Sequence, residues 1–369
     1  MENTIHAKYG LKRVINASGR MSILGVSAPT DTVMEAMKQG GQKYVEMSEL
    51  VKNSGEYIAT KLKCEAALVV NSASSGIALS VAGIVTKGQK RKALKLHQEE
   101  IKENEILILK GHNVQYGAPI ETMIALGGGK VIEVGYANEG KKEDVLEAIN
   151  EKTVALLFVQ SHHAVQKNML TVEEMAEISR KYQIPLIIDA AAEEDLLTYI
   201  QFGDIVIYSG SKALEGPTSG IVCGKAKYVD MVKVQMSGIG RGMKVGKEQI
   251  FGLLQALDQY EEKIDNSEQE KKKLERFLDL NKFPGVHVSI IQDEAGRAIY
   301  RARISLDAAV SQLHALDVVQ QLKYGKIAVY TRDYGASQGF FDLDARSFQE
   351  DDLDVLFIRL IEILGGESR

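Results

Sequence analysis

Cysteine is scarce in this chain of 369 residues, which contains only Cys64 and Cys223. Neither cysteine lies in a CxxC pair or at a cysteine–histidine spacing that suits zinc, so the sequence argues against a structural zinc site. His162 and His163 are adjacent, but no further ligands accompany them, and we predict no metal site. Each cysteine is expected to be a small buried apolar side chain rather than half of a disulfide.

The sequence also lacks a membrane segment and an excess of positive charge. Residues 1–13 are polar and mixed in charge, unlike the apolar core of a signal peptide. The longest stretch of low charge, residues 68–85, is interrupted by Asn71 and several serines, which favours a strand leading into a buried helix. The formal net charge of -5 gives no overall basic field for nucleic acid or anionic lipid. We therefore expect a cytoplasmic protein without a nucleic-acid or membrane partner.

The chain is long enough for one large domain and a smaller one. Its central part alternates short apolar runs with helical patterns, and one helical pattern begins with a capping box formed by Thr171 and Glu174. This alternation predicts an α/β domain with a mostly parallel sheet covered on both faces, whose ligands bind at the carboxyl ends of the strands. The predicted strands are 66–71, 105–110, 130–134, 153–160, 185–190, 204–209 and 219–224.

The pattern changes after about residue 245. Residues 248–280 form a long helical region of increasing charge, and strand-like segments follow at 287–293, 298–306, 326–333 and 339–344. These segments predict a smaller α+β domain at the C-terminus. We place an N-terminal arm at 1–30, the large domain at 31–250 and the small domain at 251–369.

Two residues that follow neighbouring predicted strands carry the main chemical signal. Lys212 comes after the strand 204–209, where partial burial would lower the pKa of its amine and free it to form a Schiff base. Asp189 ends the apolar strand 185–190, where a carboxylate is costly unless it meets a cation, such as a protonated pyridine nitrogen, or caps a helix. A surface lysine and a cap for a helix starting near Ala191 are the simpler interpretations.

Small residues after other strands suit the phosphate of a cofactor. Ser74, Ser75 and Gly76 lie between a strand and a helix, where backbone N–H groups and hydroxyls bind anions. Ordinary N-capping by Ser74 would explain the same pattern. Ser209 and Ser211 flank the turn before Lys212 and offer further hydroxyl groups.

Histidine, tyrosine and arginine residues complete the set of candidates. His112 follows the strand 105–110 and could stack on a cofactor ring, with Tyr116 as the other choice. His163 follows the strand 153–160 and is a candidate acid or base. Arginine binds carboxylate and phosphate through two parallel hydrogen bonds, so we also select three arginines for substrate anions: Arg20, Arg241 and Arg332.

Several segments, in their order and spacing, resemble a family of pyridoxal-phosphate (PLP) enzymes that contains selenocysteine synthase and an ammonia-lyase of amino sugar acids. The segments are YGLKRVINASGRMSILG, EAALVVNSASSGIAL, GGGKVIEVG, TVALLFVQSHH, IPLIIDAAAEEDL and IVIYSGSKALEGPTSGIVCG, with weaker likeness in YTRDYG and FFDLDAR. The resemblance implies the aspartate-aminotransferase-like fold (fold type I), PLP bound to Lys212, Asp189 at the ring nitrogen and a phosphate site at residues 74–76. Glu215 replaces the first glycine of the family's turn after the lysine.

The resemblance also implies an activity and an assembly. Selenocysteine synthase has an additional N-terminal domain for tRNA, whereas this chain reaches RVINASGR within its first twenty residues. We therefore expect α,β-elimination from a phosphorylated 2-amino-2-deoxy sugar acid, D-glucosaminate 6-phosphate, in a homodimer or a larger homo-oligomer. The alternatives are a seryl-tRNA transferase or another amino-acid lyase on the same PLP site, and a catalytically silent binding protein with this fold.

Overall fold

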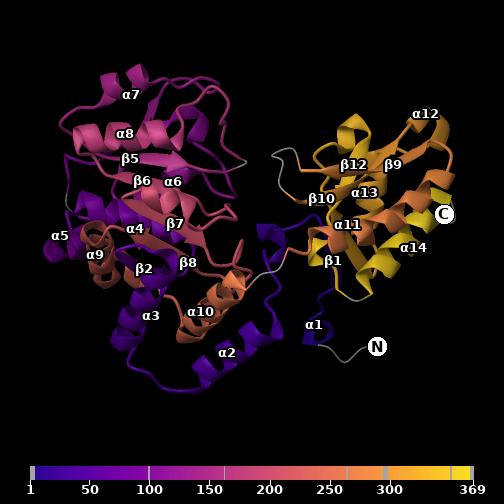
Figure 1. The fold of residues 1–369 in the computed structure, drawn as a ribbon, viewed down its shortest axis with the longest axis horizontal. Coiled ribbons are helices and arrows are strands. Elements are labelled where there is room, and N and C mark those ends of the chain that lie inside the picture. The colour runs from indigo at the N-terminus through magenta and orange to yellow at the C-terminus, as the bar shows by residue number, and fades with distance from the viewer. Residues whose placement is uncertain are drawn as a thin grey trace. The chain divides into compact units, whose positions relative to one another are not determined.

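All seven strands predicted in the central part of the chain join one sheet of the computed structural model (Figure 1). The strand order is β2-β8-β7-β6-β5-β3-β4, and β8 runs antiparallel to both of its neighbours whereas the remaining pairs are parallel. The mostly parallel sheet confirms the predicted α/β class. The strands are β2 (Ala66–Val70), β3 (Glu105–Leu109), β4 (Lys130–Val134), β5 (Thr153–Val159), β6 (Leu186–Asp189), β7 (Ile205–Ser209) and β8 (Gly220–Gly224).

The structure describes residues 5–98, 100–161, 163–262, 265–293, 298–349 and 351–365. The chain divides into two units, of which unit 1 comprises Met1–Ala28 and Lys263–Arg369 and unit 2 comprises Pro29–Glu262. The boundary expected after residue 250 falls inside α10 (Lys247–Glu261), which packs on α2 (Asp31–Gln42) within unit 2. Residues 1–28 belong to the same unit as the C-terminal part of the chain, whereas the sequence predicts a separate N-terminal arm at 1–30.

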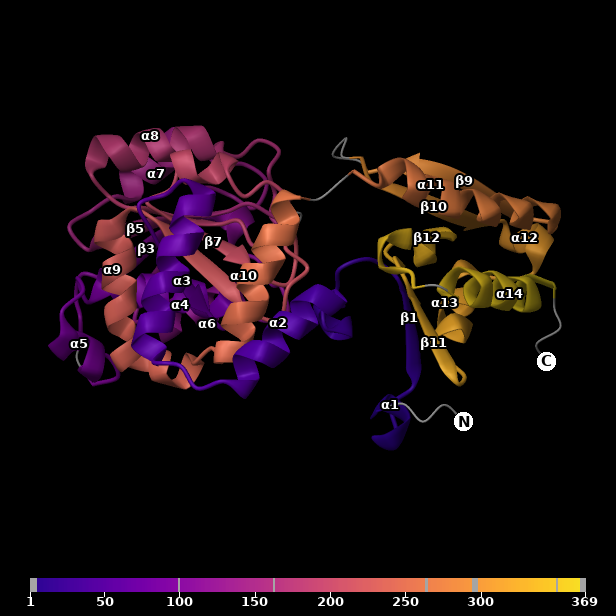
Figure 2. The same ribbon diagram turned by 60° about the horizontal axis from the view of Figure 1, so that its bottom comes forward.

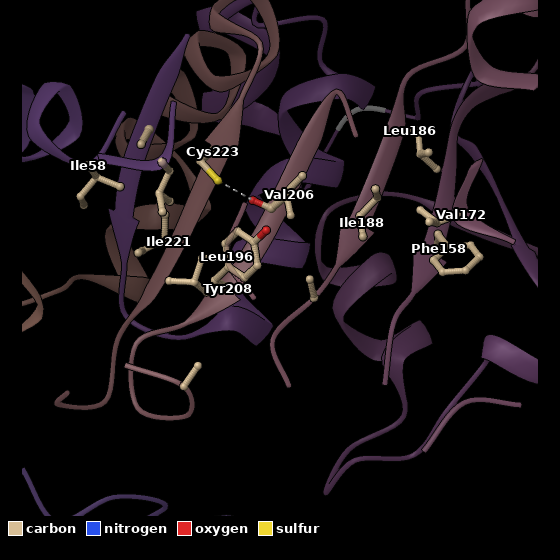
Figure 3. Close-up of a cluster of buried hydrophobic side chains, with 14 of the residues drawn as sticks. Ile58, Phe158, Val172, Leu186, Ile188, Leu196, Val206, Tyr208, Ile221 and Cys223 are labelled. Atoms are coloured by element: carbon tan, nitrogen blue, oxygen red, sulfur yellow. Dashed lines mark hydrogen bonds between the residues drawn. The ribbon is translucent and has the colours of Figure 1, made fainter. Parts of the chain in front are cut away.

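Side chains on both faces of the sheet in unit 2 are buried, which explains why its strands are apolar throughout. On one face the strands pack against α3 (Met47–Leu62), α8 (Val172–Tyr182) and α10. Figure 3 shows part of this face, including Phe158, Tyr208 and Cys223. The other face packs against α4 (Ala73–Val85), α6 (Ile120–Leu126) and α9 (Ala226–Val234). Each fully buried Leu, Ile, Val or Phe stabilises the fold by about 1.5–3 kcal/mol relative to an exposed one.

Unit 1 has its own core and two small sheets. β1 (Arg13–Ala17) pairs in parallel with β11 (Ile327–Thr331), as Figure 2 shows. β10 (Tyr300–Leu306) pairs antiparallel with both β9 (Val286–Gln292) and β12 (Phe340–Leu343). The longer helices of this unit are α11 (Ser267–Glu275), α13 (Ala315–Lys323) and α14 (Asp352–Gly365). The four strand-like segments expected after residue 245 therefore form strands β9 to β12.

The long helical region expected at 248–280 is interrupted. α10 ends at Glu261, and α11 begins at Ser267, whose N–H donates to the Asp265 side chain at 2.9 Å. The two helices belong to different units, so the continuous charged pattern hid a boundary in the chain. In the part of the chain that the structure describes, no helix has the length and apolar character that crossing a bilayer requires.

Candidate active site

Lys212 lies in a tightly closed loop between β7 and β8. The N–H of Gly210 donates to the Ser219 carbonyl at 2.9 Å, and the N–H of Gly216 donates to the Gly210 carbonyl at 2.8 Å. A Cβ atom at position 216 would lie 2.9 Å from that carbonyl oxygen, so the loop closes in this way because residue 216 is glycine. Glu215, which replaces a family glycine, has a left-handed backbone with φ of 56°. These bonds fix the backbone on both sides of the half-buried lysine.

Lys212 and Asp189 lie at the same edge of the sheet and influence each other electrostatically. Their strands β6 and β7 are parallel neighbours, with Asp189 opposite Ile207. Burial lowers the pKa of Lys212, and the charge of Asp189 opposes this effect. Burial raises the pKa of Asp189, and a hydrogen bond from Ala191 and the charge of Lys212 oppose it. Among the described residues, Lys212 and Asp189 form no direct ion pair. An aromatic ring could bind between the amine and the carboxylate only if the two groups do not contact each other.

The environment of Asp189 excludes one of the simpler interpretations. Its carboxylate accepts a hydrogen bond from the N–H of Ala191 at 3.1 Å, and the residue is only 8% exposed. Residues 190–197, all described, form turns and bends, so the helix that we considered near Ala191 is absent and Asp189 caps no helix. A buried carboxylate with one backbone donor keeps most of its capacity for a cationic partner.

The N-terminus of α4 corrects the expected roles of three small residues. Ser72, not Ser74, is the N-cap, and Ser75 completes a capping box with it. The N–H of Ser75 donates to the Ser72 hydroxyl at 3.1 Å, and the N–H of Gly76 donates to the Ser72 carbonyl at 3.0 Å. An anion would therefore meet the N–H groups of Ala73 and Ser74, which have no partner inside the helix. Gly76 serves packing, because a Cβ there would lie 3.0 Å from Ile207 Cγ2.

Tyr116 lies closer to the other candidate residues than His112 does. His112 is fully buried, contacts the edge of the Phe158 ring at 4.6 Å between centroids and accepts from the Val159 N–H at 3.3 Å. Burial raises the pKa of the Tyr116 phenol, and the negative charge of Asp189 raises it further. The Ser74 hydroxyl opposes these two effects. The hydroxyl oxygen of Tyr116 is buried without a well-formed hydrogen bond to any described residue. Nε2 of His112 is likewise buried without a partner among the described residues, so both rings stay candidates for contact with a cofactor.

Three other predicted residues of unit 2 lie around the Lys212 loop. Burial lowers the pKa of His163, and the charge of Lys212 lowers it further, so the imidazole lies within electrostatic range of the amine. The hydroxyl oxygens of Ser209 and Ser211 are 3.3 Å apart, and both residues are buried. His162 lies outside the described residues.

The predicted arginines belong to two different units of the chain. Arg241 is exposed and lines a cavity of about 1160 Å³ between β2, α3 and the segment that follows α9, and this lining includes neither Lys212 nor Asp189. Arg20 and Arg332 belong to unit 1. There Nη1 of Arg332 donates to the Ser18 carbonyl at 3.4 Å, and burial lowers the pKa of the Arg332 guanidinium.

Sequence reasoning missed two polar groups that the structure places beside these candidates. Ser72 could have been found, because the spacing of Ser72 and Ser75 is that of a capping box. Asp344 is fully buried next to arginines in unit 1, and nothing in FFDLDAR distinguishes it from Asp342 before the fold is known.

The family model described as SelA, L-seryl-tRNA selenium transferase, matches residues 14–283. The chain belongs to this family. It is 41% identical over 365 residues to a D-glucosaminate-6-phosphate ammonia lyase of Salmonella typhimurium, with 98% of each chain covered. It is also 35% identical over 362 residues to a 5'-C-glycyluridine monooxygenase-decarboxylase of Streptomyces, covering 96% of this chain and 90% of that relative.

Solved structures show the same relationship. A structure of D-glucosaminate-6-phosphate ammonia-lyase matches with a TM-score of 0.94 and 40% identity over the whole of both chains. The aspartate aminotransferase of Thermotoga maritima matches with a TM-score of 0.52 and 17% identity, over 98% of this chain and 94% of that one, and this likeness concerns the fold alone. The predicted family and the aspartate-aminotransferase-like fold are confirmed.

Proposed function

We propose that this chain is a PLP-dependent ammonia-lyase that converts D-glucosaminate 6-phosphate into 2-dehydro-3-deoxy-D-gluconate 6-phosphate and ammonia. The observation that carries the proposal is the arrangement of Lys212 and Asp189 at adjacent strand ends, in a chain 41% identical to such a lyase along nearly its full length. Enzymes of this family and fold use PLP, which matches the predicted cofactor.

The residues at this edge of the sheet fit the cofactor. Asp189 is a buried carboxylate that would pair with the ring nitrogen, and Lys212 supplies the amine that attaches the cofactor. The N–H groups of Ala73 and Ser74, with the Ser74 hydroxyl, would hold its phosphate, and Ser209 and Ser211 offer further hydroxyls. His112, or Tyr116 as the other choice, would contact the ring. When bound, PLP supplies an electron sink for the charge left at the substrate Cα.

The side chains of this chain would then move two protons. Burial lowers the pKa of Lys212, which favours the neutral Nζ that would accept the proton from the substrate Cα. His163 would donate a proton to the C3 hydroxyl oxygen, which leaves as water. Burial of the Lys212 amine limits its contact with competing water. Arg20, Arg241 and Arg332 are the proposed partners of the substrate carboxylate and phosphate, and the following subsection develops Arg332.

Borohydride reduction followed by peptide mass spectrometry tests the cofactor assignment. The cofactor should be found covalently fixed to Lys212, and Lys212→Ala should take up no reducible label and should lose ammonia release by at least about a thousandfold. A label on another lysine would overturn the assignment. Assays of ammonia and 2-keto acid release from amino sugar acids with and without phosphate test the substrate, and serylated tRNA serves as the competing substrate.

The proposal extends to location and assembly. We place the enzyme in the cytoplasm as a homodimer or larger homo-oligomer, supported by the predicted resemblance to a family that assembles in this way. Light scattering on the purified protein measures the assembly directly, and a monomer at all concentrations would contradict it.

A further inference from the structure

Three segments of unit 1 meet where strands β1, β11 and β12 end. β1 and β11 run in parallel, with Ala17 opposite Thr331. The N–H of Asp344, just after β12, donates to the Ala17 carbonyl at 2.8 Å. The backbones of Arg332 and Asp342 exchange hydrogen bonds of 2.9 and 3.0 Å. The motifs RVINASGR, YTRDYG and FFDLDAR are therefore brought together by backbone pairing.

Asp344 is the centre of this group. It is fully buried, and it receives hydrogen bonds from Arg346 Nε at 2.9 Å and from Nη2 at 2.7 Å, one on each carboxylate oxygen. Nε of Arg301, a residue only 6% exposed, lies 3.5 Å from the same carboxylate, and its Nη1 binds Asp293 at 3.0 Å. Burial alone would raise the pKa of Asp344, but the hydrogen bonds and charges of these arginines outweigh it and lower the pKa.

Arg332 differs from its neighbours in lacking an acidic partner. Among the described residues it forms no ion pair with a carboxylate, and its hydrogen bond to the Ser18 carbonyl is long, at 3.4 Å. Its pKa is lowered by burial and then by the positive charge of Arg301, and the charge of Asp344 opposes these two effects only in part. The neighbouring Thr331 hydroxyl is buried and has no partner in the described parts of the chain. A desolvated guanidinium of this kind gains most from an oxyanion that accepts two of its N–H groups.

We propose that Asp344 is a positioning residue, which fixes Arg346 and Arg301 as flanking cations so that Arg332 binds an oxyanion of the substrate. The oxyanion is a carboxylate or a phosphate, the two acidic groups of the proposed substrate. The identity of the substrate rests on the proposed function, whereas the binding of an oxyanion at Arg332 is measured without turnover.

The change in anion affinity in Asp344→Asn distinguishes a positioning role of Asp344 from a role that only balances charge. If Asp344 only offset positive charge, Asp344→Asn would make the site more positive and would tighten anion binding. If Asp344 positions the arginines, the same change removes two charge-assisted hydrogen bonds and lets the guanidinium groups separate. Asp344→Glu keeps the charge but adds a methylene group at a fully buried position, which displaces the carboxylate from its arginine partners. A positioning role therefore predicts weaker anion binding in Asp344→Glu as well.

Calorimetric titration of the PLP-loaded protein with inorganic phosphate at constant ionic strength tests the proposal. Using the loaded protein keeps phosphate out of the cofactor site. Phosphate affinity should fall about tenfold or more in Asp344→Asn, since charge-assisted hydrogen bonds are lost. Asp342→Asn is the matched control, because Asp342 also holds an arginine through two bonds, Arg303 at 2.7 and 3.0 Å, and its affinity should stay within about twofold.

Unchanged or tighter phosphate binding in Asp344→Asn would overturn the proposal, as would a wild-type protein that binds no phosphate. If Asp344→Asn does not fold, the more exposed Arg346→Gln replaces it, and phosphate affinity equal to wild type would again reject the site. In turnover, KM should rise while kcat stays within about threefold, because uniform binding is lost.

Two substrate fragments identify the bound group. Gluconate carries the carboxylate alone and glucitol 6-phosphate carries the phosphate alone, and each is tested as a competitive ligand. Weaker binding of one fragment in Asp344→Asn assigns the corresponding oxyanion to Arg332, and undiminished binding of both contradicts the proposal. If the wild-type protein binds phosphate in the expected way but has no lyase activity, the proposed function is rejected, whereas the inference about Asp344 and Arg332 is not.

Discussion

At the scale of single residues, burial is the largest cause of the pKa shifts of the groups around the Lys212 loop. It lowers the pKa of Lys212 and of His163, and it raises the pKa of Asp189. The charges of Lys212 and Asp189 partly counteract burial at each other's site. The charge of Lys212 favours the neutral imidazole of His163, so neutralising that amine would raise the His163 pKa and increase the protonated fraction at a given pH.

His163→Gln should lower kcat by about a hundredfold to ten-thousandfold, the usual contribution of a general acid. Cofactor binding should be retained, because His163 is exposed and is not among the proposed cofactor contacts. In the wild type, kcat should decrease as pH rises through the His163 pKa, and this limb should be absent from the variant. Steady-state kinetics across pH measure both effects. His97→Gln, at an exposed surface position, is the control, and an unaltered kcat in His163→Gln would reject the role.

His112 should make stability depend on pH. Burial lowers its pKa to about 4, so the folded protein keeps the imidazole neutral while the unfolded chain is protonated below about 6.5. The stabilisation is therefore complete above pH 6.5 and is lost as pH falls toward 4, by up to about 3 kcal/mol. Urea unfolding at several pH values should show a steeper loss in wild type than in His112→Gln. Equal slopes in the two proteins would contradict the assignment.

The main pair of the candidate site could be predicted from the sequence because polar residues directly after apolar strands are unusual. Lys212 and Asp189 stood out for that reason, and strand order alone puts them at one edge. The sequence does not choose between His112 and Tyr116 as the residue that contacts the ring, since the choice depends on which way the two side chains point. Asp344 was missed because its burial results from pairing among three segments far apart in the chain.

At the scale of elements, the turn between β2 and α4 is held by its neighbour β8. A Cβ atom at Gly220 would lie 2.6 Å from the carbonyl carbon of Ser72 and 2.8 Å from the nitrogen of Ala73. The absence of a side chain at Gly220 therefore allows the proposed phosphate site to sit against the start of β8.

Gly220→Ala should displace this turn. We expect a loss of stability of about 1–3 kcal/mol from overpacking and a weaker affinity for PLP. Thermal unfolding and PLP titration measure the two effects. Gly41→Ala is the control, since the nearest atom to a Cβ there is Glu248 Cβ at an ordinary 3.6 Å, and its stability should be unchanged or slightly raised. Wild-type PLP affinity in Gly220→Ala would contradict the role of this close approach.

The strands were predictable because runs of five to seven apolar residues between turns have few other interpretations. The end of α10 was not, because a charged helix face continues smoothly into the charged start of α11. Local pattern therefore identified the elements, whereas tertiary packing decided which unit each one joined.

At the scale of the whole molecule, the proposed functions divide between the two units. Ser74, Asp189 and Lys212 belong to unit 2, and the arginine group around Asp344 belongs to unit 1. Each unit has a separate hydrophobic core. Ligands that bind one unit should therefore stabilise that unit first.

Hydrogen exchange with and without PLP tests this division. The cofactor should slow exchange in residues 72–76 and 209–219 of unit 2, because it stabilises the state that binds it. Residues 286–292 and 300–306, which form β9 and β10 of unit 1, should exchange at the same rate in both samples. Protection confined to unit 1 would contradict the proposed cofactor site.

The pairing of β1 with β11 has a consequence for how the protein is made. Strand β1 emerges early from the ribosome, but its partner follows more than three hundred residues later. Unit 2 can complete its sheet before β11 has been synthesised. Unit 1 contains both ends of the chain, so it can fold only when the C-terminal part has been made. A product that stops before residue 327 would lack this partner, leaving the edge of β1 open to chaperones or to aggregation.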